Sequence, residues 1–242
     1  SYEIIRRGDA EVMLAGGCEG PLTDATVAGF ARMKALSTRN DDPTAASRPF
    51  DAERDGFVVA EGSATLVLEE LEHARRRGAR IYAEVCGYGA SADGYHITTP
   101  SPGGAGAVRA ARRARYKAGL DASDIDLVSA HATSTGEGDP TELMGINSLV
   151  GEHAHNVSVT ATKSSIGHAL GAAGAMAAVA TVKALDDGVV PPTLNLHQPD
   201  EHAGELDLTP LAARERELDV ALVNAFGFGG QNSAIILQRW NG

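Results

Sequence analysis

Short apolar runs separated by polar or glycine-rich stretches mark the first third of this chain. Residues 11–17 (EVMLAGG), 64–71 (ATLVLEEL) and 81–85 (IYAEV) have the length of strands, and each predicts a buried strand. The paired glycines that close the first run predict its end. Residues 37–54 are polar and predict a loop, whereas 72–78 predict a charged helical turn.

Beyond residue 104, segments with the period of a helix alternate with short apolar runs. The expected helices are 105–118, 140–150 and 169–185, and the expected strands are 125–129, 157–161, 220–224 and 234–238. This alternation predicts an α/β fold. A glycine-rich turn between the last two strands favours mixed rather than purely parallel pairing.

Composition and charge narrow the class of protein. Hydrophobic residues make up 43% of the 242 residues, which predicts a globular chain, and 28 glycines with only 5% aromatics predict close backbone packing. The net charge of −11 argues against nonspecific binding to nucleic acid or to an anionic membrane. The basic segment 111–117 fits a solvated helix face better than a binding patch. The longest apolar run, 169–182, is too short to span a bilayer.

Polar residues gather directly after three of the expected strands. The segments are 129–139 (SAHATSTGEGD), 162–168 (TKSSIGH) and 224–232 (NAFGFGGQN). Ligand-binding groups in α/β sheets cluster at the carboxyl ends of strands. We therefore expect these three segments to form one site.

Each segment taken singly also has a purely structural interpretation. A histidine after a strand is usually a hydrogen-bonded structural residue, residues 133–135 could cap the next helix, and Lys163 could be a surface charge. Residues 227–230 could be only a hairpin turn. No cysteine or carboxylate cluster accompanies the histidines of the polar loop at 153–155, so no metal site is expected.

Taken together, the three segments are specific. The order His-x-Thr-Ser-Thr, Thr-Lys-Ser…Gly-His and Asn-x-Phe-Gly-Phe-Gly-Gly-x-Asn resembles the β-ketoacyl-[acyl-carrier-protein] synthases of the thiolase-like superfamily, and the fatty-acid elongating type II enzymes above all. The segments LSTRN, RDGF, DGYH and VPPTLN extend the resemblance over essentially the whole chain. It implies a partial thiolase-like layered αβαβα fold, with residues 1–80 as the remainder of the N-terminal half and 81–242 as the C-terminal half.

The resemblance implies a role for each polar motif. His131 and His168 would hold the malonyl thioester oxygen on which enolate charge develops, as neutral imidazoles that donate hydrogen bonds. Lys163 would hold the catalytic loop and bias its electrostatics. Its expected partner is Glu142, because a buried lysine without such a partner tends to lose its proton.

The remaining motif residues would bind substrate and shape the pocket. The resemblance implies that Thr133 and Thr135 bind the phosphopantetheine arm and that Phe226 gates the acyl pocket. Phe228 would help to desolvate the malonyl carboxylate. Gly227 and Gly229 would let the backbone turn and supply an N–H to a thioester oxygen. Lys34 would contact the acidic carrier protein, although a plain surface lysine is an equal alternative.

The implied reaction is a decarboxylative Claisen condensation of an acyl thioester with malonyl-acyl-carrier-protein. It calls for no cofactor and no metal, and it implies acyl carrier protein as a partner, a homodimer when complete, and a cytoplasmic location without nucleic-acid or membrane partners. The resemblance places the nucleophilic cysteine upstream of this sequence. Neither Cys18 nor Cys86 stands at a helix N-terminus that would favour a thiolate.

Because of that missing nucleophile, three other functions remain open. The chain could be a malonyl-thioester decarboxylase, a noncatalytic partner subunit that shapes the chain-length pocket, or part of a polyketide ketosynthase. The presence of His131, Lys163 and His168 weighs against the noncatalytic subunit. We expect that the chain alone does not condense acyl groups and that an upstream companion segment supplies the nucleophile.

Overall fold

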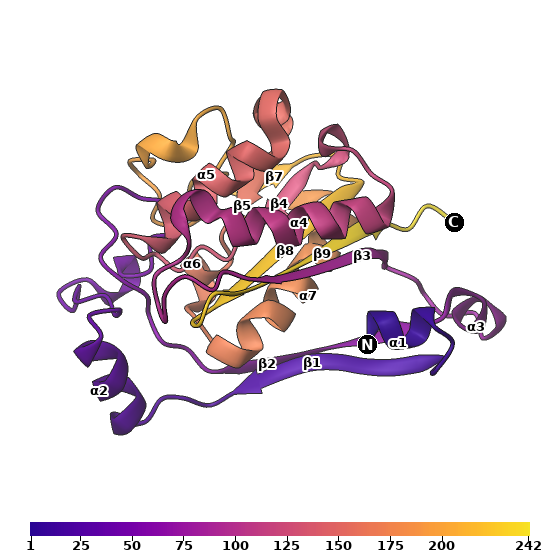
Figure 1. The fold of residues 1–242 in the computed structure, drawn as a ribbon, viewed down its shortest axis with the longest axis horizontal. Coiled ribbons are helices and arrows are strands. Elements are labelled where there is room, and N and C mark those ends of the chain that lie inside the picture. Colours follow the sequence, from indigo (N-terminus) through magenta and orange to yellow (C-terminus); the bar gives the residue numbers. More distant parts are fainter.

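A five-stranded mixed sheet lies at the centre of the structure, a computed structural model that describes residues 1–242 (Figure 1). Its strands are β3 (Ala83–Ala92), β4 (Leu127–Ser129), β5 (Ser158–Thr160), β8 (Val220–Gly227) and β9 (Gln231–Arg239). They stand in the order β3-β9-β8-β4-β5. β4 pairs in parallel with β5 and β8, whereas β9 runs antiparallel to β8 and β3. The expected mixed pairing is confirmed.

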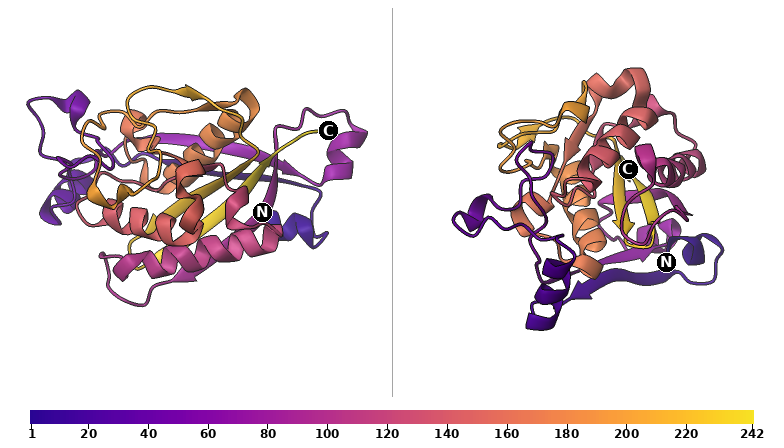
Figure 2. Two further views of the ribbon diagram at one scale, coloured as in Figure 1. Left: turned by 90° about the horizontal axis from the view of Figure 1, so that it is seen from above. Right: turned by 60° about the vertical axis from the view of Figure 1, so that its left-hand side comes forward.

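Helices cover both faces of this sheet (Figures 1 and 2). On one face, α4 (Ala105–Ala118) and α5 (Gly138–Val150) pack against β-strand residues such as Val128 and Leu222. On the other face, α7 (Ala173–Asp187) packs against residues such as Leu127 and Val223. Successive residues of a strand point to opposite faces, so one short strand contributes to both hydrophobic cores.

A two-stranded antiparallel ribbon adds a further layer beyond α7 (Figure 1). It consists of β1 (Val12–Glu19) and β2 (Gly62–Glu69), and both strands contact α7. A Cβ atom at Gly17 would lie 2.4 Å from the carbonyl oxygen of Gly171, so the glycine permits close approach at this point. The resulting succession of helix, sheet, helix and ribbon agrees with a partial layered thiolase-like fold.

Short elements complete the chain. The remaining helices are α1 (Tyr2–Arg6), α2 (Asp24–Arg32), α3 (Leu71–Arg76) and α6 (Lys163–Ile166), and the remaining strands are β6 (Val189–Val190) and β7 (Arg214–Glu215). The 3₁₀ helices are Pro43–Ala45, Pro102–Gly104, Ala122–Asp124, Gly151–Asn156, Leu170–Ala172 and Glu201–Ala203. None of the helices combines the length and the apolar character needed to cross a bilayer.

Several element boundaries differ from the sequence-based expectation. The helix at 105–118 is confirmed, but α7 begins at Ala173 instead of 169 because Leu170 has a φ of 41° and begins a 3₁₀ turn. β3 continues seven residues beyond its predicted end at 85, since Gly87 and Gly89 pair with β9. Cβ atoms there would lie about 2 Å from the carbonyl oxygens of α4. The paired glycines of β1 lie inside the strand instead of ending it, and α2 was not predicted.

The outer edge of β3 is occupied by arginine side chains from α4. The amide of Asp93 bonds to Gly230 beside β9, so the alternate residues Ala92 and Ala90 direct their carbonyl groups away from the sheet. Arg109 donates to the carbonyl oxygen of Ala92 at 3.1 Å, and Arg113 donates to that of Ala90 at 3.0 Å. The β3 edge of the sheet therefore accepts hydrogen bonds from α4, the helix that covers this part of the sheet.

Candidate active site

A cavity of about 780 Å³ opens beside the carboxyl ends of β4, β5 and β8. Residues from all three polar segments line it, among them His131, Thr133, His168 and Phe226. The expectation that the three segments meet is therefore confirmed. Thr135, Gly227, Phe228 and Glu142 also lie in the wall, whereas Lys163 lies behind it.

The loop after β4, residues 130–137, has an unusual backbone, and we call it the catalytic loop after its expected role. Ala132 and Ser134 have φ values of 32° and 69°, in the left-handed region that costs energy for residues other than glycine. The turn that they make brings the hydroxyl groups of Thr133 and Thr135 within 3.1 Å of each other at the cavity. The strained backbone thus places two hydroxyls side by side.

Two buried carboxylates of α5 hold this loop. Glu142 accepts the amides of His131 and Ala132 at 2.8 and 2.7 Å, and Asp139 accepts the amide of Ser134 at 3.0 Å. Burial raises the pKa of both carboxyl groups, that of Asp139 to about 6. The side chains therefore act as acceptors that replace backbone partners lost in the turn.

The two histidines of the site lie close together and have lowered pKa values. Their ring centroids lie 5.5 Å apart with the ring planes nearly perpendicular. Burial, together with the charge of Lys163, lowers the pKa of His168 to about 3 and that of His131 well below its usual range. Nδ1 of His168 accepts the amide of Leu170 at 3.2 Å, so the proton of this imidazole resides on Nε2. An Nε2–H group is thus available to a ligand.

Lys163 lies behind the histidines and binds the backbone of one of them. Its Nζ donates to the carbonyl oxygen of His131 at 2.5 Å. Burial lowers the pKa of Lys163 to about 8, against the opposing effect of the negative charges of Glu142 and Asp139. Glu142, the expected partner of Lys163, interacts with it through charge and not through a direct bond, since the oxygens of Glu142 accept from the backbone amides and from Asn224. Lys163 and Glu142 meet through the peptide groups of His131.

Aromatic rings form a continuous series along the cavity. The ring of Phe226 lies 5.4 Å from that of His131, and Phe228, which is 50% exposed, lies 6.4 Å from Phe30. The ring centroid of Phe57 lies 5.2 Å from that of Phe30 and 5.2 Å from that of His168. Sequence reasoning missed Phe30 and Phe57 as site residues. Phe57 stands in the RDGF segment and could have been found there, whereas Phe30 belongs to an unpredicted helix.

The glycine-rich turn between β8 and β9, residues 227–230, is built differently from the catalytic loop. Gly229 and Gly230 have positive φ values of 82° and 73°, which glycine adopts without strain. The amide of Gly229 donates to the carbonyl oxygen of Ile97 at 2.7 Å. That bond occupies the N–H group of Gly229, and the expectation that a glycine of this turn supplies an N–H to a thioester oxygen stays a prediction.

The two cysteines lie away from the cavity. Cys18 is exposed on β1, and Cys86 lies on β3, where burial raises the pKa of its thiol to about 11. Neither belongs to the cavity wall. No group of three or more side chains in the structure is arranged to hold a metal ion.

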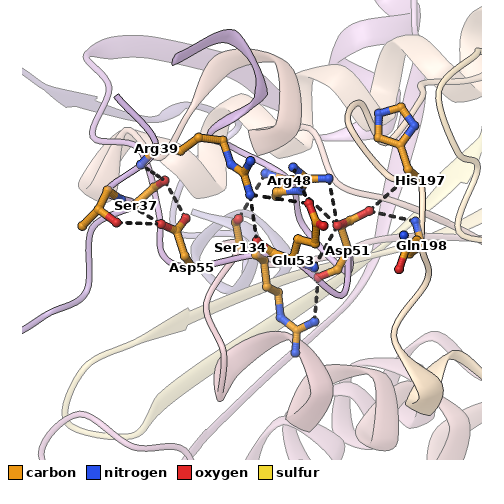
Figure 3. A network of polar contacts seen from close by, with 11 residues as sticks. Ser37, Arg39, Arg48, Asp51, Glu53, Asp55, Ser134, His197 and Gln198 are labelled. Atoms are coloured by element: carbon orange, nitrogen blue, oxygen red, sulfur yellow. Dashed lines mark hydrogen bonds and ion pairs between the residues drawn. The ribbon is translucent and has the colours of Figure 1, made fainter. Parts of the chain in front are cut away.

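A polar network connects the catalytic loop with residues 37–57, which we call the brace segment (Figure 3). The buried carboxylate of Asp51 accepts from Arg48 at 3.0 Å and from the amides of His197 and Gln198 at 2.7 and 2.9 Å. The backbone of Arg48 donates to the hydroxyl of Ser134 at 3.1 Å. The brace segment is therefore bonded both to residues 197–198 and to the catalytic loop.

Comparison with protein families matches nearly four-fifths of the chain to two models of a single enzyme class. Residues 1–74 match the model described as beta-ketoacyl synthase, N-terminal domain, and residues 82–197 match beta-ketoacyl synthase, C-terminal domain. Similar curated proteins include 3-oxoacyl-[acyl-carrier-protein] synthase 2 of Rhizobium meliloti, 54% identical over 99% of this chain. The enzyme of that name from Vibrio cholerae is 50% identical over 98% of this chain. The chain spans 56% and 57% of the lengths of these two relatives.

Solved structures give the same result. A β-ketoacyl synthase from Burkholderia phymatum superimposes with a TM-score of 0.94 at 43% identity, over 99% of this chain and 57% of that one. A type II polyketide ketosynthase in complex with its acyl-carrier protein superimposes with a TM-score of 0.96 at 38% identity, over 99% of this chain and 59% of that one.

Proposed function

The chain belongs to the β-ketoacyl synthase family, and from that premise we propose that its cavity decarboxylates a malonyl thioester for a decarboxylative Claisen condensation in fatty-acid elongation. The observation that carries the proposal is the pair of neutral imidazoles, His131 and His168, in the cavity wall. They supply hydrogen-bond donors without a proton to lose at neutral pH. Such donors suit an oxygen that becomes negative during the reaction.

The histidine donors stabilise the charge that decarboxylation creates. The bond between the malonyl α-carbon and the carboxylate breaks, carbon dioxide leaves, and the electron pair passes into an enolate whose oxygen carries the charge. Nε2–H of His168 donates to that oxygen, and His131 completes the donor pair. Each preorganised donor in a site shielded from water is worth about 3 kcal/mol for such a step.

Lys163 and the aromatic rings set the environment of this step. The positive charge of Lys163 favours the enolate and also keeps the imidazoles neutral. Its bond to the carbonyl oxygen of His131 fixes the backbone that carries one donor. The rings of Phe226 and Phe228 exclude water from the malonyl carboxylate, which then releases its charge as neutral carbon dioxide.

The paired hydroxyls of Thr133 and Thr135 bind the amide and hydroxyl groups of a phosphopantetheine arm. Their separation of 3.1 Å and their place in the cavity wall support this role. An acyl carrier protein is the proposed owner of the arm, in agreement with the carrier-protein complex of a similar ketosynthase. Lys34, which lines the cavity mouth, is the proposed contact with an acidic carrier surface.

Completion of the condensation needs an acyl thioester for the enolate to attack. Neither Cys18 nor Cys86 lies in the cavity wall, so the acyl group must be held by a group outside these 242 residues. We assign residues 1–80 to the N-terminal half and 81–242 to the C-terminal half of the condensing enzyme, which acts as a cytoplasmic homodimer. The higher identity to fatty-acid enzymes than to the polyketide ketosynthase favours fatty-acid elongation.

Replacement of His168 tests the proposal directly. The His168→Ala variant should release carbon dioxide from malonyl-pantetheine about 100-fold more slowly than the unchanged chain, because one enolate donor is lost. The control is His155→Ala, which alters an exposed histidine outside the cavity. Equal rates for His168→Ala and the unchanged chain would contradict the assignment of the donor pair.

A further inference from the structure

The catalytic loop depends on contacts from the brace segment as well as on its own helix. Besides the carboxylates of α5, the loop receives the amide of Gly56, which donates to the carbonyl oxygen of Ser134 at 2.9 Å. The amide of Phe50 donates to the buried carboxylate of Asp139 at 2.9 Å. With the bond from Arg48, all of the polar backbone and side-chain atoms of Ser134 have partners. The strained residue is therefore held from both sides.

One side chain of the brace segment reaches beyond Ser134 to the next part of the loop. Nε of Arg54 donates to the carbonyl oxygen of Thr135 at 2.9 Å, and Nη2 reaches that of Gly136 at 3.4 Å. Nη1 donates to the carbonyl oxygen of Asp51 at 2.9 Å. The guanidinium plane thus joins the brace segment to the peptide that follows the second threonine of the hydroxyl pair.

A carboxylate on a third segment fixes this guanidinium. Asp200 pairs with Nη2 of Arg54 at 2.8 Å, and the side chains are only 11% and 7% exposed. Asp200 in turn accepts the amide and Nδ1 of His202 at 2.9 and 2.7 Å, and its own amide donates to the carbonyl oxygen of Phe50. Arg54 is therefore a cation with a buried side chain, in which each of the three guanidinium nitrogens has a partner, and a lysine cannot reproduce its fork geometry.

The two functions of the catalytic loop have separate supports. The histidine backbone is held by Glu142 and Lys163, neither of which touches Arg54. The Thr135–Gly136 peptide is held by Arg54. A change at Arg54 should therefore alter the position of the Thr135 hydroxyl and leave the enolate donors in place.

We propose that Arg54 is a positioning residue that sets the affinity of the cavity for the phosphopantetheine arm by fixing the Thr135–Gly136 peptide through the Asp200 ion pair. The inference rests on the proposed function, because the arm is the ligand that the threonine hydroxyls are proposed to bind. Arg54 touches the loop and not the ligand. Its effect is on binding instead of on bond breaking.

The first experiment measures pantetheine binding by NMR titration of the chain and of its Arg54→Ala, Arg54→Lys and Arg7→Ala variants. Loss of charge-assisted hydrogen bonds should weaken binding at least about fivefold in Arg54→Ala, with an intermediate value in Arg54→Lys. Arg7→Ala removes an exposed arginine that pairs with Asp9 and should bind as the unchanged chain does. Pantetheine carries no malonyl group, so this measurement is independent of decarboxylation.

The second experiment compares two malonyl thioesters, one of pantetheine and one of ethanethiol, which lacks the arm. Arg54→Ala should raise KM for malonyl-pantetheine at least about fivefold and change kcat less than about twofold, while kcat/KM for the ethyl thioester stays within about twofold. Circular dichroism of each variant checks that it is folded, and Arg54→Lys, which keeps a positive charge beside Asp200, provides the second variant.

The outcomes separate the two ideas. Equal pantetheine affinity in Arg54→Ala and the unchanged chain, or an equal loss of kcat/KM with both thioesters, overturns the role of Arg54. Failure of the unchanged chain to bind pantetheine also overturns it. Pantetheine binding that depends on Arg54, without carbon dioxide release by the unchanged chain, supports the role of Arg54 and contradicts the proposed decarboxylation.

Discussion

The catalytic loop and the glycine-rich turn border the same cavity but are built on opposite principles. The catalytic loop places Ala132 and Ser134 at positive φ and fixes them with buried carboxylates and with the brace segment. The turn uses Gly229 and Gly230 for its positive φ values, and its backbone bonds to Ile97, Asp93 and Asn232 without a buried carboxylate. The loop that carries His131, a proposed donor, thus has a strained backbone held by buried bonds, whereas the turn that carries Phe228 reaches its positive φ values with glycine and without strain.

Removal of Glu142 should break this comparison most strongly. Glu142→Ala leaves the buried amides of His131 and Ala132 without acceptors, so the free energy of unfolding should fall by about 3 kcal/mol. Urea denaturation measures the loss. The control is Glu72→Ala, which breaks an exposed ion pair with Arg75 and should cost less than about 1 kcal/mol. A loss no larger than in that control would mean that the carboxylate does not hold the loop.

The charge of Lys163 on the catalytic-loop side of the cavity predicts a pH dependence of the reaction rate. The pKa of Lys163 is lowered to about 8, so its positive charge is present below that pH and is lost as the pH rises through it. The rate of malonyl-thioester decarboxylation should therefore fall about tenfold per pH unit above pH 8 if only the charged form is active. The histidines add no loss between pH 5 and 8, since the pKa of His168 lies at about 3.

A Lys163→Arg variant tests that assignment, because arginine stays protonated across this range. Its remaining activity, whatever its size, should show no decline between pH 8 and 10. A decline identical to that of the unchanged chain would assign the titration to another group.

The strain in the catalytic loop predicts a stabilising substitution. Glycine adopts a φ of 32° more easily than alanine, so Ala132→Gly should raise the free energy of unfolding by about 1 kcal/mol. The same exchange in the middle of α4, Ala110→Gly, should lower it by about 1 kcal/mol. Thermal unfolding of both variants gives the comparison, and a loss at Ala132 as large as the loss at Ala110, which is equally buried, would show that Ala132 carries no strain.

The opposite exchange in the turn should have the smallest effect. A Cβ atom at Gly229 would meet no atom within 4 Å, so Gly229→Ala adds only the backbone cost of a φ of 82°, about 1 kcal/mol or less. Gly136→Ala is the matched control, because its Cβ also meets nothing and its φ is not positive. The difference between the two melting temperatures isolates the backbone term, and a larger cost at Gly136 would reverse the reasoning.

The sequence predicted the parts of the fold that follow from local periodicity. The helix at 105–118 has a regular apolar face and ends before Gly119, which adopts a left-handed conformation, so its boundaries could be read directly. β3 could not, because its glycines appear as a loop until α4 is placed against them. Element type followed from neighbouring residues, whereas strand length depended on a helix that comes later in the chain.

The sequence predicted which motifs form the site but not the hydrogen bonds that connect their residues. The three motifs meet as expected because they stand at the ends of β4, β5 and β8, which are neighbours in one sheet. The third motif begins inside β8, which continues to Gly227 instead of ending at 224. The bond from Lys163 to the carbonyl oxygen of His131 could not be read, since it depends on the backbone path of the catalytic loop. Phe30 also escaped prediction, because its helix carries no motif and reaches the cavity only through the fold.

The arginines along β3 have a consequence for how the molecule meets its own copies. An exposed strand edge is a template on which another chain can add a strand, and repeated addition leads to aggregation. Arg109 and Arg113 already occupy the outward carbonyl oxygens of Ala92 and Ala90, and they leave positive charge along the same line. A strand of another chain would have to displace two guanidinium groups before it could pair with β3 there. α4, which covers one face of the sheet, therefore also protects the edge of β3 against the addition of further strands.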